Sequence, residues 1–319
     1  MTYEKEKGFT LVEMMISLAV GGIALGVVYM IFTTQQRSYI AQEEVVEMQQ
    51  EQRMAMEIMA REIRNAGSNP QGIAATAAPG NGCGDEPVPF ATPRTTGGKP
   101  RISVAGPFRI KFSMDLDAGC GCTGAGDMDL DAGSDCTGAG ENVTFRFANT
   151  VDADGNGIAD AGADDIGRDT GANPQPLASN VQAIGFAYAY DSNADGLLEV
   201  DGGGRTIWAV PNAAGDTWFS LDTDNNGVID ENDPPPVSFG LADDTLLDQI
   251  RAVRIWLLVR ASRPDPSFLH NAMRDQAGNP VRYKVGVNVI DPTQGNAIAD
   301  HFRRRLLDAS VRCRNLGLL

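Results

Sequence analysis

The sequence predicts an α+β fold in which a long N-terminal helix packs on an antiparallel β-sheet with long acidic loops. Residues 10–66 form an apolar run followed by a polar, periodic segment without proline, and Gly67 and Pro70 end it. Short β-rich runs separated by long glycine-rich loops fill the rest of the chain. With 319 residues, 42% of them apolar, the chain can bury one substantial core.

The predicted helix has two different halves. Residues 9–32 contain a single charged residue, Glu13, and are long enough to cross a bilayer at about 1.5 Å per residue. In residues 33–67, apolar side chains recur at three- and four-residue steps between Gln, Glu and Arg, which is typical of a helix with one buried face. We therefore expect the first half in a membrane or helical bundle and the second half against the sheet.

Five segments have the composition of strands: residues 108–112, 143–147, 181–190, 250–259 and 283–289. Residues 250–259 are nearly continuous in apolar side chains, which predicts a central strand covered by the helix on one face. The expected organisation is a polar leader (1–8), a transmembrane or bundle-forming half-helix (9–32), an amphipathic half-helix (33–67) and a globular β domain (68–319).

The charge is distributed unevenly along the chain. Its formal net charge is −16, and residues 112–244 hold 25 acidic residues against three basic ones. Residues 245–319 hold 12 basic and six acidic residues. An acidic centre argues against nucleic acid as a partner, because binding to phosphates needs clustered Lys and Arg. It favours cations instead.

Three acidic loops carry the pattern of a calcium-binding loop. They are L1 (residues 152–164, beginning DADGNGIAD), L2 (191–202, beginning DSNADGLLE) and L3 (222–233, beginning DTDNNGVID). Oxygen side chains stand at positions one, three and five, glycine at six and an acid at nine, as in the first part of an EF-hand loop. The candidate ligands are Asp152, Asp154, Asn156 and Asp160 in L1, Asp191, Asn193, Asp195 and Glu199 in L2, and Asp222, Asp224, Asn226, Asp230 and Asp233 in L3.

None of the three loops has the bidentate glutamate expected at position twelve. Ala163, Gly202 and Asp233 occupy that position. We therefore expect weak calcium binding of the extracellular type, with L3 the best candidate, L1 next and L2 last. The alternative is that these Asp-Gly and Asn-Gly steps are only turns on an acidic surface.

The five cysteines are candidates for disulfide bonds: Cys83, Cys120, Cys122, Cys136 and Cys313. An odd number leaves at least one of them unpaired within the chain, and the sequence does not choose among the pairings. A bridge such as Cys122–Cys136, formed in an oxidising compartment, is simpler than a zinc site, because the chain has no C-x-x-C pair and both histidines lie far away in sequence.

Gly8 followed by Phe-Thr-Leu-Val-Glu (residues 9–13) and an uncharged apolar helix resembles the type IV prepilin signature. The strand VRIWLLVR (253–260) and the ending RRR (303–305) with VRCRNLG (311–317) resemble PilW-type minor pilins. The resemblance implies that a prepilin peptidase cuts after Gly8 and methylates the new amine of Phe9. It also implies an inner-membrane subunit with a single spanning helix, which is later drawn into an extracellular pilus made of other pilins and minor pilins.

Glu13 is the one charge in the apolar half of the helix. The resemblance implies that its carboxylate pairs with the N-terminal amine of a neighbouring subunit, and an intramembrane charge of this kind needs a partner. The alternative is that Glu13 lies at the membrane surface and interacts favourably with its own helix N-terminus.

We expect a structural protein and not an enzyme, since the sequence contains no nucleophile elbow, phosphate-binding glycine loop or His-Glu zinc motif. The leading hypothesis is a minor pilin that initiates, caps or decorates a type IV pilus and so serves assembly, adhesion or twitching motility. The alternatives are a J-type pseudopilin of a type II secretion system and a calcium-stabilised adhesin carried on a pilus.

Overall fold

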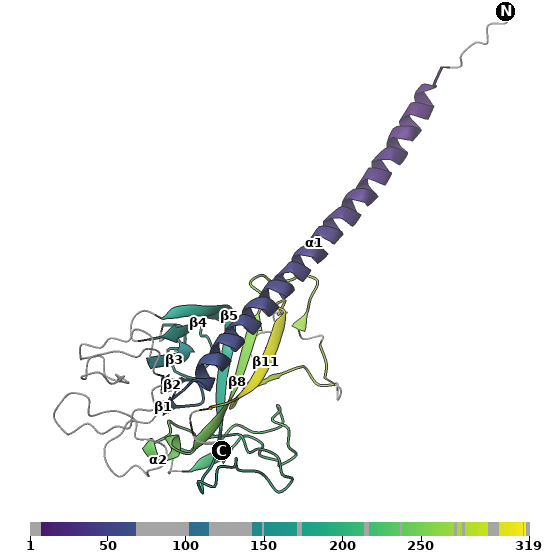
Figure 1. Cartoon of the computed structure of the whole chain (residues 1–319). Coiled ribbons are helices and arrows are strands. Elements are labelled where there is room, and N and C mark those ends of the chain that lie inside the picture. Colours follow the sequence, from purple (N-terminus) through teal and green to yellow (C-terminus); the bar gives the residue numbers. More distant parts are fainter. Residues whose placement is uncertain are drawn as a thin grey trace, which may run out of the picture. The chain divides into compact units, whose positions relative to one another are not determined.

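The computed structural model describes residues 8–67, 102–114, 142–148, 150–170, 174–213, 217–236, 238–270, 273–275, 278–292, 300–314 and 316. Within these ranges the chain forms one long helix, a large antiparallel sheet and a small β-hairpin (Figure 1). By contacts it divides into two compact units, Met1–Glu47 and Met48–Leu319, and the long helix contributes to both.

Helix α1 (Leu11–Arg64) begins and ends close to the predicted bounds of residues 10–66. The acidic Glu13 lies in its first turn, and Arg61 and Arg64 lie in its last turn, so the charges at both ends complement the helix dipole. Its buried residues all lie in the second half: Met48, Gln52, Ala55, Met56, Met59 and Ile63. The predicted amphipathic stripe is therefore the face that enters the core.

The main sheet has nine strands, and every pairing in it is antiparallel. Its strands are β1 (Ile102–Ala105), β2 (Ile110–Ser113), β3 (Asn142–Phe147), β4 (Asp164–Asp169), β5 (Gln175–Tyr190), β6 (Ala209–Pro211), β7 (Trp218–Ser220), β8 (Ile250–Arg260) and β11 (Arg304–Arg312). Strands β1 to β7 pair in sequence order, while β8 pairs with both β5 and β11. A short helix, α2 (Asp244–Leu247), precedes β8.

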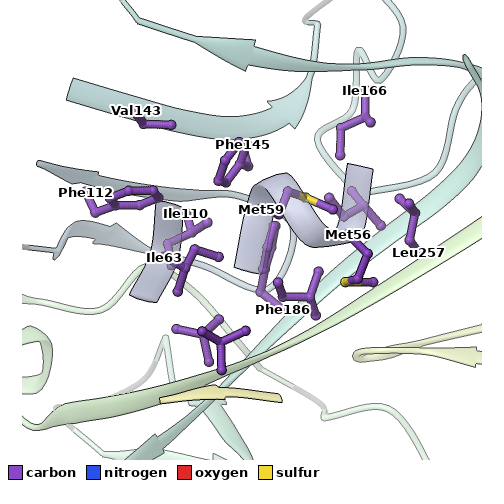
Figure 2. Close-up of a cluster of buried hydrophobic side chains, with 14 of the residues drawn as sticks. Met56, Met59, Ile63, Ile110, Phe112, Val143, Phe145, Ile166, Phe186 and Leu257 are labelled. Carbon is purple, nitrogen blue, oxygen red and sulfur yellow. The ribbon is translucent and has the colours of Figure 1, made fainter. Parts of the chain in front are cut away.

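The two faces of the central strands serve two clusters. On β8, Val253, Ile255 and Leu257 belong to the cluster that contains the second half of α1, whereas Trp256 and Leu258 belong to the cluster on the opposite face. Figure 2 shows Met56, Met59 and Ile63 of α1 among side chains from the sheet strands. The alternation required of a strand that is buried on both faces confirms the central position predicted for residues 250–259.

Polar contacts also fix the second half of α1 on the sheet. The Gln52 side chain donates hydrogen bonds to the carbonyl oxygens of Leu257 and Arg305, at 2.8 and 3.1 Å. Glu62 accepts from Arg168 of β4 at 2.8 Å, and both side chains are more than four-fifths buried. Together with the apolar packing, these contacts fix the position of α1 along the strands of the sheet.

The prediction of a single strand over residues 283–289 was wrong. Strands β9 (Tyr283–Val285) and β10 (Asn288–Ile290) instead form a separate antiparallel hairpin, reversing at Gly286, which has φ of 59°. The reversal packs against β5, where a Cβ built on Gly185 would lie 2.7 Å from the Gly286 nitrogen. Two glycines are therefore needed for this close approach of the backbones.

Candidate functional site

The first candidate site is the start of α1. Phe9 is 85% exposed and precedes the helix, and the Thr10 hydroxyl accepts a hydrogen bond from the Glu13 amide at 3.3 Å. Thr10 is therefore an N-cap, and Glu13 stands three residues later, at the position of the acidic member of a capping box. The Glu13 side chain is exposed and has no hydrogen bond or ion pair to any described residue.

The apolar half of α1 has the length and composition of a membrane span. One 18-residue window of the helix has a mean hydropathy of 2.3, and none of that window is buried within the protein. Large apolar side chains such as Leu18, Ile23 and Leu25 are more than two-thirds exposed. A continuous apolar surface of this kind requires a lipid or protein environment. The single glutamate, Glu13, therefore lies at the start of this exposed apolar surface.

The second candidate site is the set of loops L1, L2 and L3, which share one hydrogen-bonding pattern. In each loop the first aspartate accepts from the amides of positions five and six, the residue at position three accepts from the amide of position five, and the residue at position five accepts from the amide of position seven. The glycines at position six have φ of 77°, 84° and 88°. The alternating oxygens therefore turn to the inside of each loop.

Loop L3 brings three carboxylates together. One oxygen each from Asp222, Asp224 and Asp233 lies within 4.8 Å of the others, and Asp233 is fully buried. Burial works against ionisation of Asp233, but hydrogen bonds from the Asp230 and Thr223 amides outweigh it, so the pKa of Asp233 lies below its usual value. The donors are hard oxygens, and the lowered pKa of Asp233 favours its charged form, which suits the preference of Ca²⁺ for oxygen ligands.

In L2 the first aspartate already has a cationic partner. Asp191 is buried and lies 3.7 Å from the guanidinium of Arg251, which is buried as well. The position-nine residue, Glu199, accepts from the amide and hydroxyl of Ser192. Arginine thus supplies at Asp191 part of the positive charge that an ion would bring, and the lowest rank of L2 stays a prediction.

Loop L1 is closed in a similar way by its position-nine residue, since Asp160 accepts from the Ala153 amide at 2.9 Å. Its first aspartate, Asp152, has a raised pKa, mainly because of its burial. Among the described residues, only L3 brings oxygen atoms of three acidic side chains within 4.8 Å of one another.

Two basic residues near these loops could not be identified as partners from sequence. Arg205, which follows L2, bonds to Asp201 and also to the carbonyl oxygens of Asn225 and Asn226 in L3. The buried Lys284 of β9 donates to the Asp233 carbonyl at 2.9 Å. Arg205 precedes L3 by 17 residues and Lys284 follows it by 51 residues, so the fold brings them there.

Of the cysteine candidates, Cys313 alone is in the part of the chain that the structure describes. It is buried and carries a free thiol, and its burial raises the pKa to about 12. Cys83, Cys120, Cys122 and Cys136 lie outside the described residues, so their pairing stays a prediction.

Comparison with known proteins agrees with the architecture. Residues 4–29 match the prokaryotic N-terminal methylation motif. This motif, followed by a long helix that continues onto an antiparallel sheet, defines the class as type IV pilin-like. Residues 156–315, half of the chain, match the family described as type IV pilus-assembly protein W, and the chain belongs to this family.

Among solved structures, the chain is similar to the type IV-like pilin TTHA1219 from Thermus thermophilus. The identity is 15%, the TM-score is 0.34, and the match covers 84% of this chain and 97% of that one. No curated protein matches the chain. The family points to a structural protein associated with pilus components.

Proposed function

We propose that this protein is a minor pilin that helps to initiate, cap or decorate a type IV pilus. The observation that carries the proposal is the combination, in one helix, of a methylation motif and an exposed apolar surface that bears a lone glutamate. The second half of that helix packs on the sheet. Much of the sheet lies in residues 156–315, which match a family whose description names pilus assembly.

In this proposal a prepilin peptidase removes residues 1–8 after Gly8 and methylates the amine of Phe9. The subunit waits in the inner membrane with one spanning helix and is then drawn into the extracellular fibre, where adhesion or twitching motility depends on it. The Glu13 carboxylate pairs with the N-terminal amine of a neighbouring subunit. An intramembrane carboxylate costs about 2.5–3.5 kcal/mol when unpaired, so pairing at one register favours ordered addition of subunits.

The test is incorporation of variants into fibres. Glu13→Ala should insert into the membrane as well as the wild type and enter sheared fibres at a much lower level, because only subunit pairing uses the deleted charge. Glu43→Ala is the matched control, since Glu43 is an exposed glutamate further along the same helix. Equal incorporation of both variants in a co-expressed pilus system would show that Glu13 has no role in assembly.

A J-type pseudopilin of a type II secretion system is the alternative within the same class, because the prepilin motif and helix-on-sheet plan suit both machines. Deletion distinguishes them. Loss of twitching or surface attachment supports the pilus, whereas loss of exoenzyme secretion supports the pseudopilin.

We further propose that Ca²⁺ binds L3 through Asp222, Asp224 and Asp233, with Asn226 and Asp230 in the same loop. The convergence of three carboxylates, one of them buried and ionised, supports this site. L1 is the second candidate and L2 the weakest, because Arg251 already neutralises Asp191. In a pilus-borne adhesin, the further alternative, calcium in these loops would stabilise the binding surface.

A further inference from the structure

A pocket of about 310 Å³ has two residues of L1 in its lining, Asp152 and Gly155, and no residue of L3. Its lining comes from four places in the sequence: the β1–β2 turn with Phe108 and Arg109, the end of β3 with Arg146 and Phe147, L1 with Asp152, and the segment Phe239 to Leu241. The volume is at the lower end of the range for small-ligand sites. All of these residues belong to the compact unit Met48–Leu319.

The walls of the pocket are held in place by the core. The Tyr188 hydroxyl donates to the Gly106 carbonyl and the Phe186 amide to the Pro107 carbonyl, both at 2.7 Å, which anchors the β1–β2 turn on β5. The Phe108 and Phe239 rings meet edge to face, with centroids 5.6 Å apart. The pocket is therefore formed before any ligand arrives, and less ordering is needed on binding.

Among the described residues, one arginine that lines this pocket has no acidic partner. Arg146 pairs with Asp169 at 3.2 Å, and the other arginines of residues 112–244, Arg168 and Arg205, pair with Glu62 and Asp201. Arg109 is exposed and has no side-chain hydrogen bond or ion pair among the described residues, although acidic residues dominate the following segment. An arginine left unpaired beside a pocket with a partly aromatic lining is suited to bind an external anion, above all the planar carboxylate group.

We propose that this pocket binds a small organic carboxylate with a compact apolar body. The carboxylate pairs with Arg109, and the apolar body lies against Phe108, Phe239 and the half-exposed Leu241. Asp152, also in the lining, disfavours dianions and accepts hydrogen bonds from a hydroxyl or amine of the ligand. No pocket residue lies in residues 1–47, so the test of this pocket does not depend on the role of Glu13.

The experiment uses the full chain in lipid nanodiscs, with chelator present so that a cation in L1 does not contribute. The probe is para-fluorophenylacetate, followed by ¹⁹F NMR line broadening, and para-fluorophenylacetamide is its uncharged match. For a ligand of this size we expect a Kd of about 1–10 mM for the acid. The amide should bind at least about fivefold more weakly, because it lacks the charge that pairs with guanidinium.

Two variants and one control locate the binding. Arg109→Gln should lower the affinity for the acid to that for the amide. Leu241→Trp, which fills the pocket with a larger side chain, should lower the affinity for both probes. Arg312→Gln, at an exposed arginine on β11, should leave both affinities unchanged. Absence of saturable binding, equal affinity for acid and amide, or affinity unaffected by Arg109→Gln or Leu241→Trp overturns the proposal.

Discussion

At residue scale, Gln52 lies on the buried face of α1 at a position where the helical pattern alone would favour an apolar side chain. It is 1% exposed, and its amide spans two strands by donating to Leu257 of β8 and Arg305 of β11. In the sequence, Gln52 stands among other polar residues and nothing distinguishes it from them. Its role depends on the approach of β11 to β8, which sequence periodicity does not encode.

Gln52→Ala should lower the free energy of unfolding by about 1–3 kcal/mol, because two carbonyl oxygens lose a buried donor and a cavity forms. Gln50→Ala, two residues away on the exposed face, should change it by less than about 0.5 kcal/mol. Chemical denaturation of the full chain in detergent micelles gives both values. Similar small effects for the two variants would mean that the Gln52 contacts contribute little.

At the scale of elements, the sequence predicted α1 and the central strands well, because each has a strong periodic or continuous apolar signal. Residues 143–147 and 250–259 agree closely with β3 and β8. Strand β11 was not predicted, since arginines and an aspartate interrupt its apolar residues, and pairing with β8 supplies what local composition does not. The division of 283–289 into β9 and β10 likewise depends on a distant contact with Gly185.

The candidate sites show the same limit. The motif at Gly8 to Glu13 and the oxygen spacing of L1 to L3 are local, so sequence was sufficient to identify them. The ion pair of Asp191 with Arg251 and the contact of Lys284 with Asp233 join segments more than 50 residues apart. The sequence therefore indicated possible ligands, but not which carboxylates already have cationic neighbours.

Loops L2 and L3 should respond differently to the same substitution. Asp191→Asn should lower the unfolding free energy by about 3 kcal/mol in chelator, because it leaves the Arg251 charge buried without its aspartate. Asp222→Asn should cost about 1 kcal/mol in chelator, since two amide hydrogen bonds weaken, and should abolish most of the stabilisation by calcium. Thermal melts with chelator and with calcium separate the two effects. If Asp191→Asn removed as much of the calcium effect as Asp222→Asn, L2 would be an equal site.

At the scale of the whole molecule, processing determines whether α1 begins at a free amine. We expect residues 1–8 to be absent from the assembled protein and the amine of Phe9 to be methylated, as the methylation motif suggests. Mass spectrometry of the N-terminal peptide, from fibres of the native host, measures both changes. Gly8→Trp is the matched variant, since it should block cleavage; a peptide retaining Met1 in wild-type fibres would contradict the prediction.

Calcium should stabilise the folded chain as a whole, because its acidic residues repel one another. The 25 acidic residues of residues 112–244 have only three basic residues in the same stretch, and Arg146, Arg168 and Arg205 are already paired. A divalent ion bound only to the folded state adds roughly 2.7 kcal/mol at a hundredfold excess over Kd. Some of this gain comes from reduced repulsion, which extends beyond the ligands themselves.

The melting temperature should therefore rise between chelator and millimolar calcium at matched ionic strength. Magnesium should substitute poorly, because it requires a tight octahedron and loses its waters reluctantly. The double variant Asp222→Ala with Asp224→Ala should lose much of the rise, and the pair Asp191→Ala with Asp195→Ala should lose least of it. An equal rise in melting temperature with sodium chloride alone would mean that calcium acts only by screening the acidic charges. No rise at all would mean that L1, L2 and L3 are only acidic turns.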